Sequence, residues 1–424
     1  MVRLNRISRI SIGASAISTL ALVGGLNSAQ AQPPPIDPGA APAPTDVAPA
    51  PAPPPPAAPG GLKIEGKDAT VKLGFLAQPA YEYLNRTASQ DEQFSTFFLR
   101  RARLLVSMTL GSQFELFYDT ETANLGRGAG PTPGAGLPGG GLAATAGMTT
   151  QDVVATWKPM DEFKLDVGMM LIPLSHNGLQ SAASLYGLDY YAFSFQQAGA
   201  LLNYVGRDTG IQARGLVSKH LEYRLGLFTG LRAPAPAAVM GMPAAARKSQ
   251  AAPRLAARLQ YNVFDAETAF FYGGTYGGSK KILSFGAGVD VQKGYKAFAV
   301  DGFMDWPLGP DVVTAQLDFV HYEDGTGADL WAGVAKQNDV MVEAGYRIGA
   351  VQVSPIVRFE MAKMDAAVAA SPNQTRIGAG VAWWYMGHNA NVKLFYTYVK
   401  PEADNVTTLS AYSQINLQTQ FYVF

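Results

Sequence analysis

The segment from Phe97 to Glu121 constrains the fold most, because it contains two strand-like runs that meet at Gly111-Ser112. In the first run, one parity is apolar: Phe98, Ala102, Leu104, Val106, Met108 and Leu110. The other parity carries Arg101, Arg103, Ser107 and Thr109. The second run repeats this pattern, with Phe114, Leu116 and Tyr118 opposite Gln113, Glu115, Asp119 and Glu121. Since side chains alternate across a strand, we predict a β-hairpin with one apolar and one polar face.

A soluble sandwich and a barrel in lipid would both produce this alternation, and the amino terminus bears on the choice. Arg3, Arg6 and Arg9 precede an apolar run from Ile10 to Leu26, which is followed by Ala29-Gln30-Ala31. A basic region, an apolar region and a small-residue cleavage site are typical of a secretory signal peptide. We therefore predict that residues 1–31 are a signal peptide and that the mature chain begins at Gln32. The alternative is an N-terminal membrane anchor, for which the apolar run is short and interrupted by glycine.

Residues 32–60 consist mostly of proline and alanine. Such a segment cannot bury a core and favours an extended polyproline II conformation. We predict a periplasmic linker here, with a disordered tail as the alternative, and a folded domain over residues 61–424.

Composition narrows the class of the folded domain. No later segment offers the ~18 uninterrupted apolar residues of a transmembrane helix. The chain has no cysteine, which argues against a disulfide-stapled secreted module. With 33 basic and 33 acidic residues the formal net charge is zero, so nothing indicates binding to nucleic acid.

Amphipathic strand-like runs recur along the whole of the folded domain, each long enough for the ~9 to 11 residues of a tilted transmembrane strand. We predict about sixteen strands, at residues 68–84, 95–110, 112–123, 149–158, 162–173, 208–219, 221–232, 253–264, 282–292, 296–306, 311–323, 338–348, 351–364, 373–386, 389–400 and 411–424. The prediction is an all-β fold, a transmembrane antiparallel β-barrel.

Short and long connections alternate along the chain, as in barrels with short turns on one side and long loops on the other. The alternation breaks at Asp265 to Lys281, a long segment where a short turn is due. We interpret this segment as a structured inner turn, because a further strand would give an odd number. An even number closes the barrel, so that no sheet edge meets hydrocarbon.

Other motifs predict no chemistry. The four histidines, His176, His220, His321 and His388, lack the spacing of zinc ligands. No nucleophile, base and orienting acid stand out, so we predict neither an enzyme nor a cofactor.

Four segments together resemble the phosphate-selective porin O and P family: Phe98 to Leu104, Gly168 to Pro173 with Ser175 to Leu185 after it, Arg207 to Ala213, and Leu225 to Gly230. The resemblance implies a sixteen-stranded trimeric porin. It also implies that the loop after the fifth strand, Ser175 to Arg207 in this sequence, folds into the lumen as a constriction.

The resemblance further implies that basic side chains line the pore, and Arg101 and Arg103 match the family's arginine-rich strand. We predict that the pore-lining and constriction residues are Arg101, Arg103, Arg214, Arg224, Arg254, Arg258 and Asp189. Guanidinium groups bind oxyanions in a fork, so such a wall favours anions. Alternatively, the arginines pair with lumenal acids on neighbouring strands. These acids are Glu115, Asp119, Asp166, Glu222, Asp290, Asp301, Asp318, Glu343 and Glu360.

The sequence thus predicts a bacterial outer-membrane porin through which small hydrophilic solutes or ions diffuse passively. A preference for phosphate-like anions is the finer expectation. The expected partners are outer-membrane lipids and lipopolysaccharide, permeating ions or anionic solutes, and two further copies of the chain in a homotrimer. The alternative is a non-conducting surface barrel whose long loops bind partners.

Overall fold

The computed structural model describes residues 60–86, 93–127, 147–195, 206–230, 253–292, 294–324, 336–365, 372–403 and 409–424. The predicted signal peptide and all but the last residue of the predicted linker lie outside these ranges. Residues 57–424 form one compact unit.

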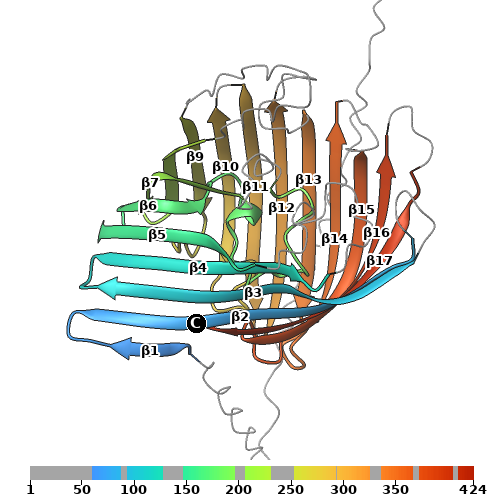
Figure 1. Ribbon diagram of the computed structural model, residues 1–424, viewed down its shortest axis with the longest axis horizontal. Helices are drawn as coiled ribbons and strands as arrows, with labels where there is room; N and C mark the ends of the chain where they lie inside the picture. The colour runs from blue at the N-terminus through green and yellow to red at the C-terminus, as the bar shows by residue number, and fades with distance from the viewer. Residues whose placement is uncertain are drawn as a thin grey trace, which may run out of the picture. The chain divides into compact units, whose positions relative to one another are not determined.

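All sixteen predicted strands are present, each within a few residues of its predicted bounds. They are β2 (Ala69–Leu84), β3 (Phe94–Leu110), β4 (Phe114–Leu125), β5 (Thr149–Met160), β6 (Phe163–Leu171), β7 (Arg207–Val217), β8 (Leu221–Phe228), β9 (Arg254–Asn262), β10 (Ile282–Gln292), β11 (Tyr295–Leu308), β12 (Asp311–Asp324), β13 (Gln337–Arg347), β14 (Val353–Met364), β15 (Asn373–Trp383), β16 (Ala390–Glu402) and β17 (Tyr412–Val423). Each pairs antiparallel with its neighbours in sequence (Figure 1).

The barrel closes where β17 pairs with β2, from Gln414 opposite Leu84 to Val423 opposite Phe75. The sequence did not predict a short additional strand, β1 (Leu62–Glu65), which pairs with residues 70–73 of β2. Thus β1 continues the edge of β2 where β17 has ended, and it is not a member of the sixteen-stranded ring. We call this junction of β17, β1 and β2 the seam. Together, β17 and β1 give hydrogen-bond partners to nearly the whole length of β2.

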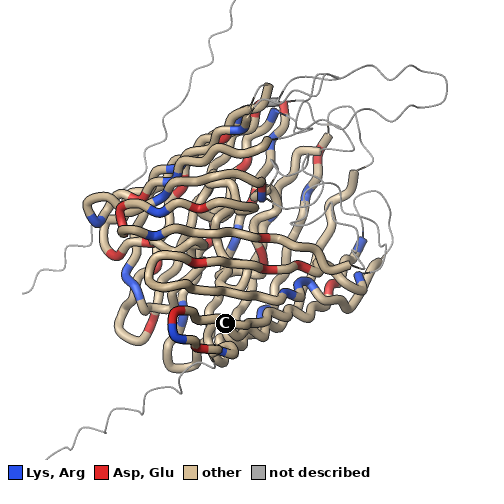
Figure 2. The backbone as a smooth tube through the Cα atoms, turned by 60° about the vertical axis from the view of Figure 1, so that its left-hand side comes forward, with Lys and Arg blue, Asp and Glu red and all other residues tan. Residues whose placement is uncertain are grey.

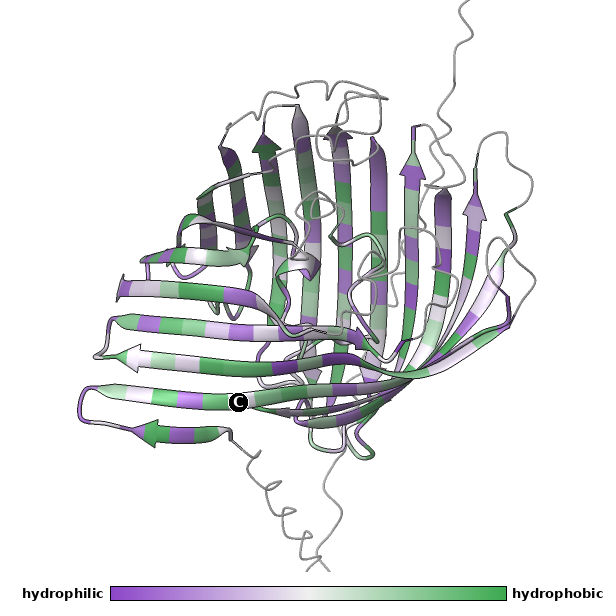
Figure 3. Cartoon of the chain, in the orientation of Figure 1, coloured by the Kyte–Doolittle hydropathy of each residue, from purple (hydrophilic) through white to green (hydrophobic). Residues whose placement is uncertain are grey.

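The two faces of the sheet differ as predicted. On β8, for example, Leu225 is 54% exposed on the outside, whereas Arg224 beside it is 1% exposed inside. Apolar and polar bands alternate along the strands in Figure 3. The outer surface carries exposed apolar side chains all around the ring: Phe75, Leu104, Ile211, Leu255, Phe285, Leu317, Val357, Ile377, Leu394 and Leu417. Within the described ranges, no helix has the length and apolarity needed to cross a membrane.

A β-bulge in the β2–β3 pair changes the predicted faces of β3. Gln78 lies opposite Arg101, but the next residue, Pro79, lies opposite Leu99. The bulge leaves Arg100 as an extra residue, since two residues on one strand then oppose a single partner. Phe98 and Arg100 therefore line an interior cavity. The prediction that Phe98 belongs to the outer apolar face was wrong, because simple parity cannot pass through a bulge.

Short connections gather at one end of the barrel, which we call the turn end, and the opposite end is the loop end. Residues 111–113, 161–162, 218–220 and 309–310 are turn-end connections. One loop-end connection, residues 293–294 between β10 and β11, is as short as these turns. The alternation of lengths thus breaks twice, once at each end, while the strand count stays even.

The seam yields a test of barrel closure. A Cβ atom on Gly74 would overlap the Phe424 side chain and the Val423 carbonyl oxygen. Overpacking of this kind costs about 1–3 kcal/mol, so Gly74→Ala is expected to lower the urea concentration at which half the barrel is unfolded. Gly302→Ala is the control, because its Cβ would lie 3.7 Å from the nearest atom, on Phe285. Heat-modifiable migration on a gel measures the urea midpoint of each variant. Equal midpoints for Gly74→Ala and Gly302→Ala would contradict the steric role of Gly74.

Candidate pore constriction

The connection between β6 and β7 spans residues 172–206. Its described part, residues 172–195 and 206, enters the barrel interior, and we call it the inward loop. It contains a short 3-10 helix, η1 (Asn177–Leu179), and most of its described side chains are buried. Figure 1 shows it in green between the β2–β6 wall and the β10–β14 wall. This confirms the constriction loop expected at Ser175 to Arg207, within the described part of that range.

The base of the inward loop is held by carboxylates of the wall. The Ser175 hydroxyl and the Asn177 backbone N–H donate to Asp318, at 2.8 and 3.3 Å. The His176 backbone N–H donates to Asp301 at 3.1 Å. Leu174 packs against apolar residues of β11 and β12. The loop therefore starts from a fixed position on the β11–β12 side of the interior.

A second segment, residues 263–281 between β9 and β10, enters the interior from the turn end, and we call it the inner turn. Arg224 donates to the carbonyl oxygens of Phe270 and Ala269, at 2.8 and 3.0 Å. Arg347 donates to Gly277 O at 2.9 Å. The sequence predicts a structured inner turn, and the structure adds that it lies inside the barrel.

The inward loop and the inner turn are joined to each other. Tyr272 exchanges backbone hydrogen bonds with the loop, donating to Leu179 O and accepting from Ser181 N, both at 2.9 Å. His176 Nε2 lies 2.9 Å from a carboxylate oxygen of Glu267. Burial alone would raise the pKa of Glu267, but His176 and hydrogen bonds from Tyr276 and Gln260 hold this pKa below its usual value. The two segments therefore form one hydrogen-bonded unit inside the barrel.

The tip of the inward loop places Asp189 against two arginines of β3. Arg100 Nε and Arg101 Nη2 each contact a different Asp189 oxygen, at 2.6 and 2.5 Å. Burial would raise the pKa of Asp189, but the charges of Arg100 and Arg101 hold it well below its usual value. Both arginines reach one carboxylate because the bulge turns consecutive residues inward. Next along the strand, Arg103 contacts Glu121 at 2.5 Å and Asp119 at 3.3 Å.

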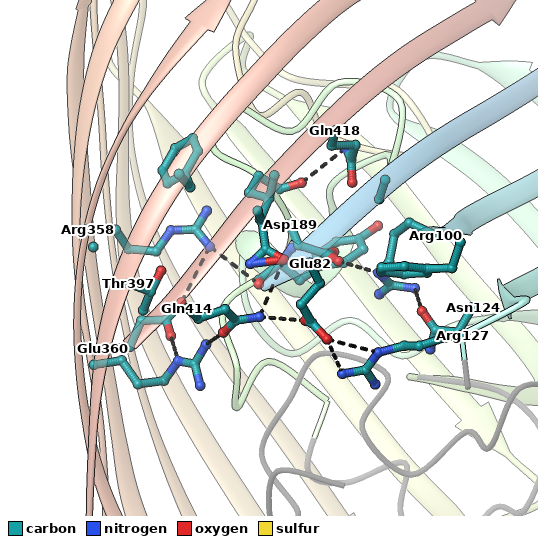
Figure 4. A pocket seen from close by; sticks show the side chains of 18 residues that line it. Glu82, Arg100, Asn124, Arg127, Asp189, Arg358, Glu360, Thr397, Gln414 and Gln418 are labelled. Atoms are coloured by element: carbon teal, nitrogen blue, oxygen red, sulfur yellow. Dashed lines mark hydrogen bonds and ion pairs between the residues drawn. The ribbon is translucent and has the colours of Figure 1, made fainter. Parts of the chain in front are cut away.

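Two cavities lie on either side of this cluster, and Tyr190 lines both. The cavity nearer the loop end is the larger, and its charged lining includes Glu82, Arg100, Arg127, Asp189 and Arg358 (Figure 4). The cavity nearer the turn end is smaller, and Arg103, Asp119 and Arg207 contribute to its wall. Asp189, Tyr190 and the β3 arginines thus stand where the two spaces approach each other.

The other four predicted arginines lie inside the barrel but away from these two cavities. Each is buried and pairs with a carboxylate: Arg214 with Asp166, Arg224 with Glu222, Arg254 with Asp290, and Arg258 with Asp301. Arg214, Arg224 and Arg258 also donate to backbone carbonyl oxygens of the inner turn or the inward loop. Basic and acidic residues lie near one another across the strands in Figure 2. All six predicted arginines thus pair with acids, as the alternative to a bare arginine wall expects. Arg224, however, pairs within its own strand, and Arg101 pairs chiefly with Asp189 of the inward loop.

Sequence reasoning missed three contributors to this interior. The sequence pattern assigned Arg100 to neither the apolar nor the polar face of its strand. Its inward direction results from the bulge, which the pattern does not show. Lys393 on β16 contacts the inward loop through two hydrogen bonds, and it follows the lumenal parity of its strand. Glu267 lies in the segment interpreted as a turn. Of the three, Lys393 had a usable signal, a lysine among inward-facing positions. No group of three or more His, Asp or Glu residues in the described ranges could hold a metal ion.

Comparisons with known proteins come from structure alone. No family model and no curated protein matches the sequence. The chain is similar to the anion-selective porin from Comamonas acidovorans, at 12% identity and TM-score 0.50, covering 84% of this chain and 100% of that chain. It is also similar to a loop L8 deletion mutant of OmpT, an outer membrane protein of Vibrio cholerae, at 11% identity and TM-score 0.50, covering 84% and 100%. These likenesses establish a shared porin-type barrel fold. The apolar outer belt of this fold is the kind of surface that a barrel presents to lipid.

The contact between His176 of the inward loop and Glu267 of the inner turn predicts that the stability of the barrel depends on pH. Because the pKa of Glu267 is lowered, its stabilisation is present above the usual carboxyl pKa and is lost as pH falls through the lowered value. At neutral pH, Glu267→Gln is expected to destabilise the barrel by about 1.5–3 kcal/mol, and the deficit should vanish in acid. Urea midpoints across pH measure it, with Glu162→Gln at an exposed turn as control. A deficit that persists unchanged in acid would contradict the assignment.

Proposed function

We propose that this protein is an outer-membrane porin, a passive channel for small hydrophilic solutes or ions. The observation that carries the proposal is the pair of cavities separated by Tyr190 and the Asp189 cluster. A closed barrel with an apolar outside and a polar, partly open inside is the architecture of a diffusion channel. No chemical reaction is part of this proposal.

The proposed path runs along the β2–β4 side of the barrel. The inward loop and the inner turn pack against each other and against the wall elsewhere, as their contacts with β8, β11 and β12 indicate. Solutes would enter the larger cavity, pass Asp189 and Tyr190 beside Arg100 and Arg101, and leave through the smaller cavity beside Arg103. We propose that Arg254 shapes the wall electrostatically and that Arg214, Arg224 and Arg258 chiefly hold the inward segments.

For selectivity, we propose a weak preference for anions. Arg100, Arg101 and Arg103 face Asp189, Glu121 and Asp119, so positive and negative groups are in balance near the narrowest point. An oxyanion would have to compete with these carboxylates for the guanidinium groups, which disfavours tight phosphate binding. Membership of the phosphate-selective O and P family remains the finer proposal, carried by the arginines of β3.

One observation favours a second candidate function, a non-conducting surface barrel. The inward loop and the inner turn together fill the interior from both ends and leave the turn-end cavity the smaller of the two. A barrel whose two cavities never connect would present its outer loops as a binding surface and pass no current.

We further propose that residues 1–31 direct export, that residues 32–60 form a periplasmic spacer, and that the barrel contacts lipopolysaccharide in the outer leaflet. A homotrimer is the proposed assembly, following the resemblance in sequence.

Planar-bilayer recording of the purified, heat-modifiable protein separates the two candidates. A porin is expected to insert in discrete conductance steps. A folded protein that never produces steps would contradict the porin proposal and favour the surface barrel.

Selectivity tests the residues of the constriction. Asp189→Asn removes the carboxylate shared by Arg100 and Arg101, so the reversal potential in a salt gradient is expected to shift toward anions. A single charge near a narrow aqueous path changes permeability ratios roughly severalfold at low salt. Asp161→Asn, whose side chain is 90% exposed at the turn end, is the control. An unchanged reversal potential for Asp189→Asn, or for Arg101→Ala with Arg103→Ala, would remove those residues from the path.

A further inference from the structure

The tip of the inward loop is held by a row of side-chain donors from the barrel wall. Gln78 of β2 and Gln420 of β17 donate to the carbonyl oxygens of Ala182 and Ala183, at 3.3 and 2.8 Å. Farther along the loop, Gln418 donates to Leu188 O and Arg358 to Tyr190 O, both at 3.4 Å. The wall thus holds the loop through its backbone, and any residue type on the loop would present the same carbonyl groups.

Lys393 of β16 lies at the centre of this row and makes its shortest contacts. Its Nζ donates to Leu185 O and to Gly187 O, both at 2.7 Å. The side chain is 2% exposed, and the ammonium lies 5.0 Å from the centre of the Trp384 ring. Hydrogen bonds from a charged donor are about twice as strong as neutral ones, so this residue holds the tip more firmly than its amide neighbours do.

The loop passes close to the wall at the residues that Lys393 holds. A Cβ atom on Gly187 would overlap the carboxylate of Glu343 and the guanidinium of Arg358. Only Leu188 separates Gly187 from Asp189, whose carboxylate contacts Arg100 and Arg101 of β3. The position of Leu185 and Gly187 therefore sets the position of Asp189 and Tyr190.

Lys393 also differs from the predicted pore arginines in its charge balance. Each of those arginines pairs with a carboxylate, whereas Lys393 forms no ion pair with any carboxylate of the described residues; its partners are carbonyl oxygens and an aromatic face. Its ammonium group is therefore in contact with no carboxylate of the described residues, while Glu343 and Asp189 act on it from a greater distance.

We propose that Lys393 is a positioning residue of the channel, which locks the tip of the inward loop through two backbone carbonyls and adds a positive charge near that tip. The positional half of this proposal follows from the contacts alone. The electrical half rests on the proposed porin function. The experiments separate the two halves.

The first experiment uses the absence of cysteine in the natural chain. Ala183→Cys introduces a single thiol at a position that is 7% exposed, and a water-soluble methanethiosulfonate reagent measures its accessibility in the folded barrel. Adding Lys393→Met should accelerate labelling at least about tenfold, since each hydrogen bond from a charged donor is worth about that factor in an equilibrium. Lys393→Arg keeps a charged donor and should restore much of the slow rate.

Lys400→Met is the matched control, because Lys400 lies on the same strand but is exposed and pairs with Glu402. Its labelling rate should equal that of the parent. Heat-modifiable migration checks that every variant is folded. Equal labelling of folded Lys393→Met and Lys400→Met variants would overturn the positional role, whether or not the protein conducts.

The second experiment concerns charge. Lys393→Gln keeps one donor but removes the charge, so its channels should open in steady steps with a reversal potential moved toward cations. Lys393→Met should add closures or noise within the open level. If wild-type steps appear and Lys393→Gln leaves the reversal potential unchanged, the charge role is wrong while the porin proposal stands. If wild-type protein gives no steps at all, the porin proposal and the charge role fail together, and the labelling result alone decides the positional role.

Discussion

The structure depends on one constraint: a sheet that faces hydrocarbon must satisfy every backbone hydrogen bond within itself. Closure of β17 onto β2 meets this constraint, and β1 extends it along the part of β2 that β17 does not reach. The same constraint explains the strict alternation of side chains, since one face must be apolar for lipid. Most polar side chains of the strands are thereby directed into the interior, where they lie close together and must find partners.

The polar side chains of the interior find two kinds of partner: carboxylates on the strands, and backbone groups of the two inward segments. Carboxylates on neighbouring strands neutralise the arginines, as with Arg214 and Asp166 or Arg254 and Asp290. Backbone groups of the inward loop and the inner turn take up most of what remains: loop N–H groups meet Asp301 and Asp318 on one side, and loop carbonyls meet glutamines and Lys393 on the other. A loop with few charges of its own can therefore be fixed across a highly charged interior.

The sequence predicted the parts of this arrangement that follow from period-two alternation and from connection lengths. These parts include all sixteen strands, the inward-facing arginines and the loop that enters the barrel. The remaining features depend on local events without a periodic signal. The bulge at Gln78 and Pro79 inserts Arg100 and reverses Phe98, and nothing in the spacing of the arginines marks its position. Lys393 carries the lumenal parity of its strand, but its importance comes from carbonyl groups about two hundred residues away, which no local pattern encodes.

The charge balance around Asp189 follows from the same physics. A buried guanidinium without a counter-ion is costly, so arginines that enter a partly dry interior tend to bring carboxylates with them. A lumen whose segments fill it from both ends is drier than an open pore, and its arginines are paired to a correspondingly greater extent. Strong anion selectivity would need guanidinium groups that remain unpaired, which requires a wider and wetter path. The inward loop and the inner turn fill much of the barrel interior. Their tight packing and the balanced charges around Asp189 both follow from this.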